Sequence, residues 1–271
     1  MRTVLITILI LYLALGALAW YWSERALFQP PPATYRADQD IIHLSTADGV
    51  RLAALWLPNP GAAFTILYSH GNAEDLGWSR PALEELRELG FAVFAYDYRG
   101  YGLSEGRPSE RGAYLDIEAA YQHVTRALGV PAERIIVHGL SLGGGPSVLL
   151  AATRPVAGLI LESTFTTAFR VVTRVPLFPI DRFRNLQRLR RVHCPVLVIH
   201  GTDDEVIPFS HGPRLFAAAP EPRRRLWVEG ATHNDLRVVA GAAYERALVE
   251  FRDLLLEGAH VRVDGRQSTE N

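Results

Sequence analysis

The sequence predicts one α/β domain, with a mostly parallel sheet of eight strands and helices on both faces. Short apolar runs alternate with longer amphipathic runs from Phe64 onward, as expected for strands joined by crossover helices. The chain has 271 residues, a length that suits a single domain of this class behind a short N-terminal segment.

Each element follows from a local pattern. Strands are expected at Ile41–Ser45, Val50–Leu57, Phe64–Ser69, Ala92–Tyr96, Ile135–His138, Gly158–Leu161, Val196–His200 and Arg225–Val228. Helices are expected at Arg80–Leu89, Arg111–Ala127, Gly144–Thr153, Ser210–Ala219 and Leu236–Leu255. Residues 164–191 interrupt the alternation and predict a short lid insertion, and the polar residues 258–271 predict a flexible tail.

Residues 1–24 form a separate segment. Val4 to Trp22 carry no charge and are long enough for a transmembrane helix that ends in an aromatic belt. We expect a single-pass membrane anchor, in the cell membrane if the source is bacterial. Because Arg2 precedes the apolar run, the catalytic domain is expected on the non-cytoplasmic side. The alternative is a cleaved signal peptide, with Ala17-Leu18-Ala19 as its cleavage site.

Composition excludes several classes of protein. The 28 basic residues are all arginine and balance 29 acidic ones to a net charge of −1, so nucleic acid is not an expected partner. The absence of lysine excludes Schiff-base chemistry, a phosphate-loop lysine and a Ser-Lys dyad. Cys194, the single cysteine, lies in an apolar run and is expected to be a buried structural thiol. No metal and no organic cofactor are expected.

The strongest motif is Gly139-Leu140-Ser141-Leu142-Gly143, which has the G-x-S-x-G pattern. A β-rich run, Arg134–His138, precedes it, and a helical run, Gly144–Ala152, follows it. A serine at a tight strand-to-helix turn is the setting of a nucleophile elbow, in which larger side chains beside the serine would collide with neighbouring backbone. Ser141 is therefore the predicted nucleophile.

A serine nucleophile needs a base and an acid that orients it, and in this type of fold the chain order is Ser, acid, His. Three carboxylates, Asp203-Asp204-Glu205, follow a predicted strand, and only His211, His233 and His260 come after them. His233 lies in a loop between the last strand and the last helix, so it is the predicted base. Spacing alone leaves the acid open among the three carboxylates, with Glu162 as a minor rival.

A second loop is expected to supply part of an oxyanion hole. His70-Gly71-Asn72-Ala73 follows an apolar strand, so the backbone N–H groups of Asn72 and Leu142 are the predicted donors to the developing negative charge. His70 itself is expected to be structural, because it precedes the acid in the sequence.

These motifs occur together and in order. They are His70-Gly71-Asn72-Ala73, Tyr96-Asp97-Tyr98-Arg99-Gly100-Tyr101-Gly102-Leu103-Ser104-Glu105-Gly106, Gly139-Leu140-Ser141-Leu142-Gly143-Gly144, His200-Gly201-Thr202-Asp203-Asp204-Glu205-Val206-Ile207-Pro208 and Thr232-His233-Asn234. The chain resembles the α/β-hydrolase superfamily, and within it the membrane-anchored α/β-hydrolase-domain proteins related to the serine aminopeptidases. The resemblance implies an α/β-hydrolase fold over residues 25–257. It also implies that Asp204 is the acid, and that Asp97 and Arg99 are structural.

The expected activity is cleavage of an ester, thioester or amide through an acyl-enzyme. The resemblance excludes haloalkane and epoxide hydrolysis, for which relatives carry an aspartate at the elbow. Apolar residues of the insertion and the neighbouring lipid favour a carboxylesterase or a lipid or acyl thioesterase acting on a small-molecule or lipid substrate. Those residues are Phe165, Val175, Leu177 and Phe178. Two alternatives remain: a peptidase in which Glu162 holds the substrate amine, and a non-catalytic, membrane-tethered binding protein.

Overall fold

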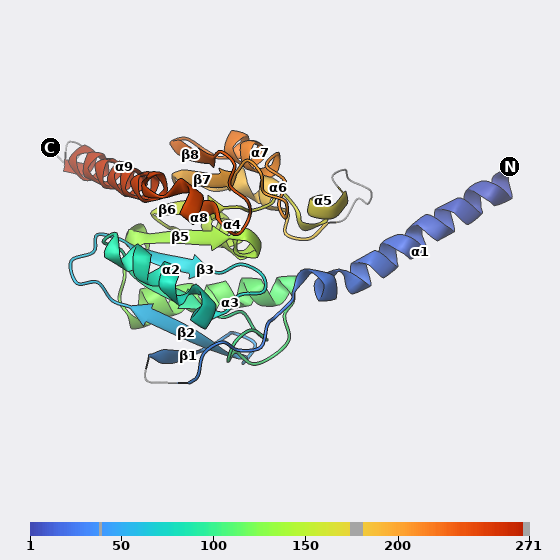
Figure 1. The fold of residues 1–271 in the computed structure, drawn as a ribbon, viewed down its shortest axis with the longest axis horizontal. Coiled ribbons are helices and arrows are strands. Elements are labelled where there is room, and N and C mark those ends of the chain that lie inside the picture. Colours follow the sequence, from blue (N-terminus) through green and yellow to red (C-terminus); the bar gives the residue numbers. More distant parts are fainter. Residues whose placement is uncertain (38–39, 174–180, 268–271) are drawn as a thin grey trace.

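A computed structural model describes residues 1–37, 40–173 and 181–267. They form a sheet covered by helices and one long helix that extends away from it (Figure 1). The strands are β1 Ile41–Ser45, β2 Arg51–Leu57, β3 Thr65–Ser69, β4 Ala92–Tyr96, β5 Ile135–Leu140, β6 Gly158–Glu162, β7 Val196–Gly201 and β8 Arg223–Val228. The α-helices are α1 Arg2–Leu27, α2 Leu76–Glu88, α3 Glu110–Gln122, α4 Gly144–Thr153, α5 Ala168–Thr173, α6 Asn185–Leu189, α7 His211–Ala218, α8 Leu236–Ala240 and α9 Ala242–Gln267.

The sheet has eight strands in the order β1-β2-β4-β3-β5-β6-β7-β8. β2 is antiparallel to β1 and to β4, and the remaining neighbours pair in parallel, which confirms the predicted mostly parallel sheet. After β3 the chain first adds β4 on one side and then returns to add β5 on the other. This reversal leaves a crevice at the carboxyl ends of β3 and β5, where open α/β sheets bind their ligands.

Both faces of the sheet are buried, as parallel strands require. On one face the core contains residues of α3, α4 and α7, and on the other it contains residues of α2, α8 and α9. β3, β4 and β6 are buried along their whole length. The strands that carry the site are therefore held from both sides.

Two helices differ from the sequence prediction. α2 begins at Leu76 rather than Arg80, because the carboxylate of Asp75 accepts a hydrogen bond from the Trp78 N–H (2.9 Å) and caps the helix there. The single helix expected from Leu236 is divided into α8 and α9 at Gly241, whose φ of +47° ends the first helix. α9 then continues to Gln267, so most of the segment predicted as a loose tail is helical.

The segment predicted as a lid contains two short helices, α5 and α6, between β6 and β7. Phe165 at its start is buried. Val175, Leu177 and Phe178, which were also expected to line an acyl pocket, lie outside the described residues.

α1 is long and apolar enough to cross a membrane by length and composition, and 6% of its most apolar window is buried. A signal sequence meets the same criterion. The helix projects away from the sheet (Figure 1). Near its end, the guanidinium of Arg182 in the lid lies 3.5 Å from the centre of the Trp20 ring.

Phe251 tests the packing of α9 against the sheet. Its ring is fully buried, so Phe251→Ala should lower the free energy of unfolding by about 3–5 kcal/mol through lost burial and a cavity. Urea unfolding of the detergent-solubilised full chain, followed by tryptophan fluorescence, measures this change. Glu250→Ala, at an exposed position of the same helix, is the control and should change stability by less than about 0.5 kcal/mol. Equal effects of the two substitutions would contradict the packing described.

Candidate active site

Ser141 stands on a single 3₁₀ turn between β5 and α4, with a φ of +50° that non-glycine residues rarely adopt. A Cβ on Gly143 would overlap the carbonyl group of Ser69, and a Cβ on Gly139 would lie 2.5 Å from the carbonyl oxygen of Gly143. The two glycines therefore let the turn approach β3 closely and present the serine at the crevice. This is the strained elbow that the sequence motif predicts.

Three side chains distant in sequence meet at this turn. His233, in the loop between β8 and α8, lies with Nε2 3.0 Å from Ser141 Oγ and with Nδ1 2.8 Å from Asp204 Oδ2. Asp204 is fixed in turn, because its Oδ1 accepts hydrogen bonds from the N–H groups of Val206 (3.0 Å) and Ile207 (2.6 Å). The carboxylate selects the imidazole tautomer with hydrogen on Nδ1, which leaves Nε2 to accept the serine proton.

The neighbouring carboxylates have other contacts. Asp203 accepts a hydrogen bond from the Thr202 hydroxyl (3.2 Å), and Glu205 accepts one from the main-chain N–H of His233 (3.2 Å). The geometry thus distinguishes Asp204 from its neighbours, which spacing could not do. Of the other late histidines, His211 bonds the N–H of Thr166 (3.0 Å), and His260 belongs to α9.

The side chain of Asn72 fixes the loop after β3 through hydrogen bonds to other parts of the chain. Asn72 Oδ1 accepts from the hydroxyl of Tyr101 (2.6 Å) and from the N–H of Gln29 (3.0 Å), and its Nδ2 donates to the carbonyl of Leu27 (2.8 Å). Asn72 and Leu142, whose N–H groups are the predicted oxyanion donors, both line a cavity that contains Ser141.

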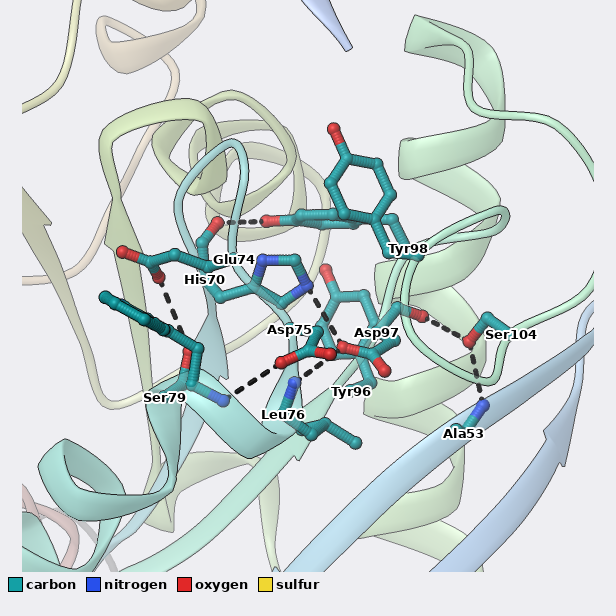
Figure 2. A network of polar contacts seen from close by, with 12 residues as sticks. Ala53, His70, Glu74, Asp75, Leu76, Ser79, Tyr96, Asp97, Tyr98 and Ser104 are labelled. Carbon is teal, nitrogen blue, oxygen red and sulfur yellow. Dashed lines mark hydrogen bonds and ion pairs between the residues drawn. The ribbon is translucent and has the colours of Figure 1, made fainter. Parts of the chain in front are cut away.

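A buried polar cluster supports this loop from below (Figure 2). His70 is 1% exposed; its Nε2 lies 3.4 Å from Asp97 Oδ1, and its main-chain carbonyl accepts from the Tyr98 hydroxyl (2.7 Å). Burial alone would lower the pKa of His70, but Asp97 reverses this and the pKa is raised. Asp97 also accepts from the N–H of Leu76 (2.9 Å), so the pair joins the loop to the start of α2. These contacts agree with a structural role for His70 and Asp97.

Arg99 has a similar structural setting. Its guanidinium bonds Asp48 (2.8 Å) in the β1–β2 turn and Asp116 (2.9 Å) on α3. It thereby ties the first hairpin to the helix layer.

Comparisons with known proteins agree with the fold described above. The family described as "Serine aminopeptidase, S33" matches residues 61–179. The chain is 42% identical to human α/β hydrolase domain-containing protein 17B over 197 residues, which are 71% of this chain and 68% of that protein. The chain belongs to the α/β-hydrolase family. It is also 44% identical over 209 residues to α/β hydrolase domain-containing protein aho-3 of Caenorhabditis elegans, over 76% of this chain and 62% of that protein.

Solved structures show the same fold at lower identity. An esterase of Pyrococcus furiosus superposes with a TM-score of 0.70 at 20% identity, over 83% of this chain and 96% of that one. A hydrolase of Pseudomonas aeruginosa gives a TM-score of 0.62 at 22% identity, over 80% of this chain and 99% of that one. The described fold is thus that of the α/β-hydrolases.

Two cavities flank Ser141 in this α/β-hydrolase. The polar cavity, of about 400 Å³, is lined by Tyr68, Gly71, Asn72, Glu74, Trp78, Ser79, Pro81, Ala82, Glu85, Leu140, Ser141, Glu162, His233, Asn234, Leu236, Arg237 and Val238. The apolar cavity, of about 380 Å³, is lined by Ala19, Ser23, Ala26, Leu27, Asn72, Ser141, Leu142, Phe165, Ala168, Phe169, Val171, Val206 and Ile207. The serine therefore lies between a mixed cavity that carries charged side chains and a cavity whose lining is mostly apolar. Within the described part of the chain, no group of three or more His, Cys, Asp or Glu side chains is arranged to hold a metal ion.

Glu162, the rival acid in the sequence analysis, lines the polar cavity and is paired with neighbouring side chains. Its carboxylate accepts from Arg237 Nε (3.0 Å), from the hydroxyl of Tyr244 (2.8 Å) and lies 2.8 Å from His138 Nε2. Burial alone would raise the pKa of Glu162, but Arg237 and His138 bring it well below 4.5. The carboxylate of Glu162 therefore stays charged and hydrogen-bonded to its neighbours.

Several contributors to the site were not predicted. Arg237 lies in a helix with no recognisable motif, and Thr164, whose hydroxyl donates to the carbonyl of Ser141 (2.7 Å), begins the irregular lid. Of the α1 residues that line the apolar cavity, Ala19 and Ser23 were assigned to the membrane segment alone. Phe165 was predicted to line an acyl pocket and does line the apolar cavity.

The Glu162–Arg237 pair gives a stability prediction. Arg237→Met leaves a buried carboxylate without its cation, which should lower the free energy of unfolding at pH 7 by about 3–5 kcal/mol. Because the pKa of Glu162 is lowered on folding, the stability contributed by the charged carboxylate is present above pH 4.5 and is lost as the pH falls below it. Urea unfolding as a function of pH measures both effects.

Glu162→Gln is the matched variant, because it keeps the shape of the side chain and removes the titration. Its stability should fall less steeply than that of the wild type as the pH drops below 4.5. Parallel pH profiles for the two proteins would contradict the assigned pKa direction.

Proposed function

We propose that this α/β-hydrolase is a serine hydrolase that cleaves an ester, thioester or amide bond through Ser141, His233 and Asp204. The supporting observation is the hydrogen-bonded series from Ser141 Oγ through His233 to Asp204, with distances of 3.0 and 2.8 Å, at a strained elbow. Geometry of this kind recurs on unrelated folds that carry out acyl transfer.

The reaction has two steps. His233 Nε2 takes the hydroxyl proton as Ser141 Oγ attacks the carbonyl carbon, and Asp204 stabilises the imidazolium that forms. The N–H groups of Asn72 and Leu142 bind the oxyanion in this proposal. The tetrahedral intermediate collapses to an acyl-enzyme as His233 returns the proton to the leaving group. Water, deprotonated by His233, then releases the acid and restores the serine.

The two cavities favour acyl substrates with a polar leaving group. The apolar cavity suits a hydrocarbon chain, and the polar cavity, on the other side of Ser141, suits an alcohol, thiol or headgroup. We therefore favour a carboxylesterase or a lipid or acyl thioesterase. A non-catalytic binding protein has no need of the complete Ser–His–Asp arrangement.

A peptidase is the second candidate, supported by the name of the matching family, serine aminopeptidase. Capture of a substrate amine needs a carboxylate with spare negative charge. Glu162 is already bonded to Arg237 (3.0 Å), which disfavours that role for it.

We also propose that α1 is a retained single-pass anchor, with the catalytic domain on the non-cytoplasmic side. The length and apolar composition of α1 support an anchor. Its last turn also bonds the domain, since the carbonyl of Leu27 accepts from Asn72 (2.8 Å) and Glu24 accepts from the N–H of Glu110 (3.1 Å).

Ser141→Ala tests the nucleophile. The wild-type full chain should react covalently with a fluorophosphonate probe and hydrolyse p-nitrophenyl esters, whereas the variant should lose labelling and at least about 10⁴-fold of the turnover. Gel fluorescence and absorbance at the p-nitrophenolate band measure these outcomes. Undiminished labelling of the variant would place the nucleophile elsewhere.

Asp204→Asn tests the acid. It preserves the shape of the side chain but disturbs the imidazole tautomer, and should lower kcat by about 10⁴-fold. Asp203→Asn is the matched control, because Asp203 contacts Thr202 rather than the ring, and its kcat should stay within about threefold of the wild type. Equal losses in the two variants would contradict the assignment.

A substrate panel separates the two hydrolase candidates. p-Nitrophenyl esters of rising chain length, compared with aminoacyl-anilides, should show higher kcat/KM for the esters, rising with chain length by up to about fourfold per methylene while the apolar cavity still has room. Faster cleavage of the anilides would favour the peptidase.

A further inference from the structure

The apolar cavity has one wall formed by the last turns of α1, the helix that extends away from the sheet. Ala19, Ser23, Ala26 and Leu27 line it from α1, at the spacing that puts residues on one face of a helix. Phe165, Ala168, Phe169 and Val171 line the opposite side from the lid and α5. A segment that could act only as a tether thus contributes to the cavity that contains Ser141.

One arginine fastens this wall to the lid. Arg182 Nε donates to the hydroxyl of Ser23 (3.0 Å), and its Nη1 lies 3.0 Å from Glu24 Oε1. The guanidinium also lies 3.5 Å from the centre of the Trp20 ring, and Trp20 meets Phe169 edge-on with ring centres 6.5 Å apart. The side of α1 that faces the lid is therefore fixed by charge, hydrogen bonding and aromatic contact.

The C-terminal end of the same wall contacts the loop after β3, which contains Asn72. Asn72 donates to the carbonyl of Leu27 (2.8 Å) and accepts from the N–H of Gln29 (3.0 Å). Phe28, the next residue, is 4% exposed, and its ring centre lies 6.0 Å from that of Phe183. The end of α1 is thus fixed in position relative to the loop that contains Asn72.

The cavity also extends toward the level of the proposed bilayer. Ala19 lies inside the uncharged run that ends at Trp22, while Leu27 lies beside the loop of Asn72. From Ala19 to Leu27 the helix rises about 12 Å. An acyl chain lying along this face would run from the membrane interface to the serine.

We propose that the last turns of α1 form one wall of the acyl-binding subsite. A long, linear acyl chain of a membrane-resident substrate then reaches Ser141 from the bilayer along Ala19, Ser23 and Ala26. The inference rests on the proposed serine hydrolase function, whose nucleophile it uses. The polar leaving group lies on the opposite side of Ser141, in the polar cavity.

A thiol footprint tests the position of the chain. Ala26→Cys adds an accessible thiol to a protein whose only cysteine, Cys194, is buried with its pKa raised to about 12. The full chain in phosphatidylcholine nanodiscs is first treated with a dodecyl or an ethyl fluorophosphonate, so that Ser141 Oγ displaces fluoride from phosphorus. The rate of N-ethylmaleimide addition is then measured by mass spectrometry. After the dodecyl probe this rate at position 26 should fall at least about tenfold relative to the ethyl probe.

Val238→Cys is the matched control, since Val238 is exposed and lines the polar cavity. Its rate of maleimide addition should be the same after either probe. Protection at position 238 instead of 26, or equal rates at position 26 after both probes, would overturn the subsite while leaving the serine hydrolase intact. Failure of both probes to react with Ser141 would overturn the proposed function itself.

A kinetic measurement supplies an independent readout. Ala26→Trp fills the cavity beside α1, so the ratio of kcat/KM for p-nitrophenyl dodecanoate to that for the acetate should fall at least about tenfold. Ala17→Trp places the same bulk two residues from Ala19, on the opposite face of the helix, and should keep the wild-type ratio. An unchanged ratio in Ala26→Trp, or the same fall in both variants, would contradict the proposal.

Discussion

The left-handed backbone of Ser141 is the constraint around which the site is arranged. That conformation is possible because Gly139 and Gly143 carry no side chains that would collide with the elbow or with Ser69 on β3. The turn lies at the carboxyl edge of the sheet, between β5 and α4. The loops after β7 and β8 begin at the same edge. Parallel strands bring those ends together, so residues separated by 92 positions, Ser141 and His233, come within hydrogen-bonding distance.

The two cavities beside Ser141 differ in chemistry because different elements of the chain line them. On one side, Glu162 at the end of β6 meets Arg237 on α8, and their mutual compensation allows charged groups in a largely buried place. On the other side, the lid and the end of α1 supply small and aromatic apolar residues. Such a division suits a substrate with one hydrocarbon part and one hydrated part, joined at the bond that is broken.

The sequence predicted all eight strands because short apolar runs bounded by turn residues have few other structures open to them. The elbow and His233 were also predicted from local context, whereas Asp204 was chosen by family resemblance, since three adjacent carboxylates are equivalent until the loop is folded. The break at Gly241 was missed because the apolar pattern continues across it. Arg182 was missed for a different reason: its partners, Ser23 and Glu24, lie about 160 positions away, and no periodicity encodes such a contact.

Asn72 bonds the main chain on both sides of the end of α1 while belonging to the loop proposed to hold the oxyanion. If α1 crosses a bilayer, its tilt is set partly by the thickness of the surrounding hydrocarbon layer. A change of tilt then acts on the amide geometry around Ser141 through two hydrogen bonds. On the proposed anchoring and activity, the thickness of the surrounding lipid is thereby coupled to the geometry of the nucleophile.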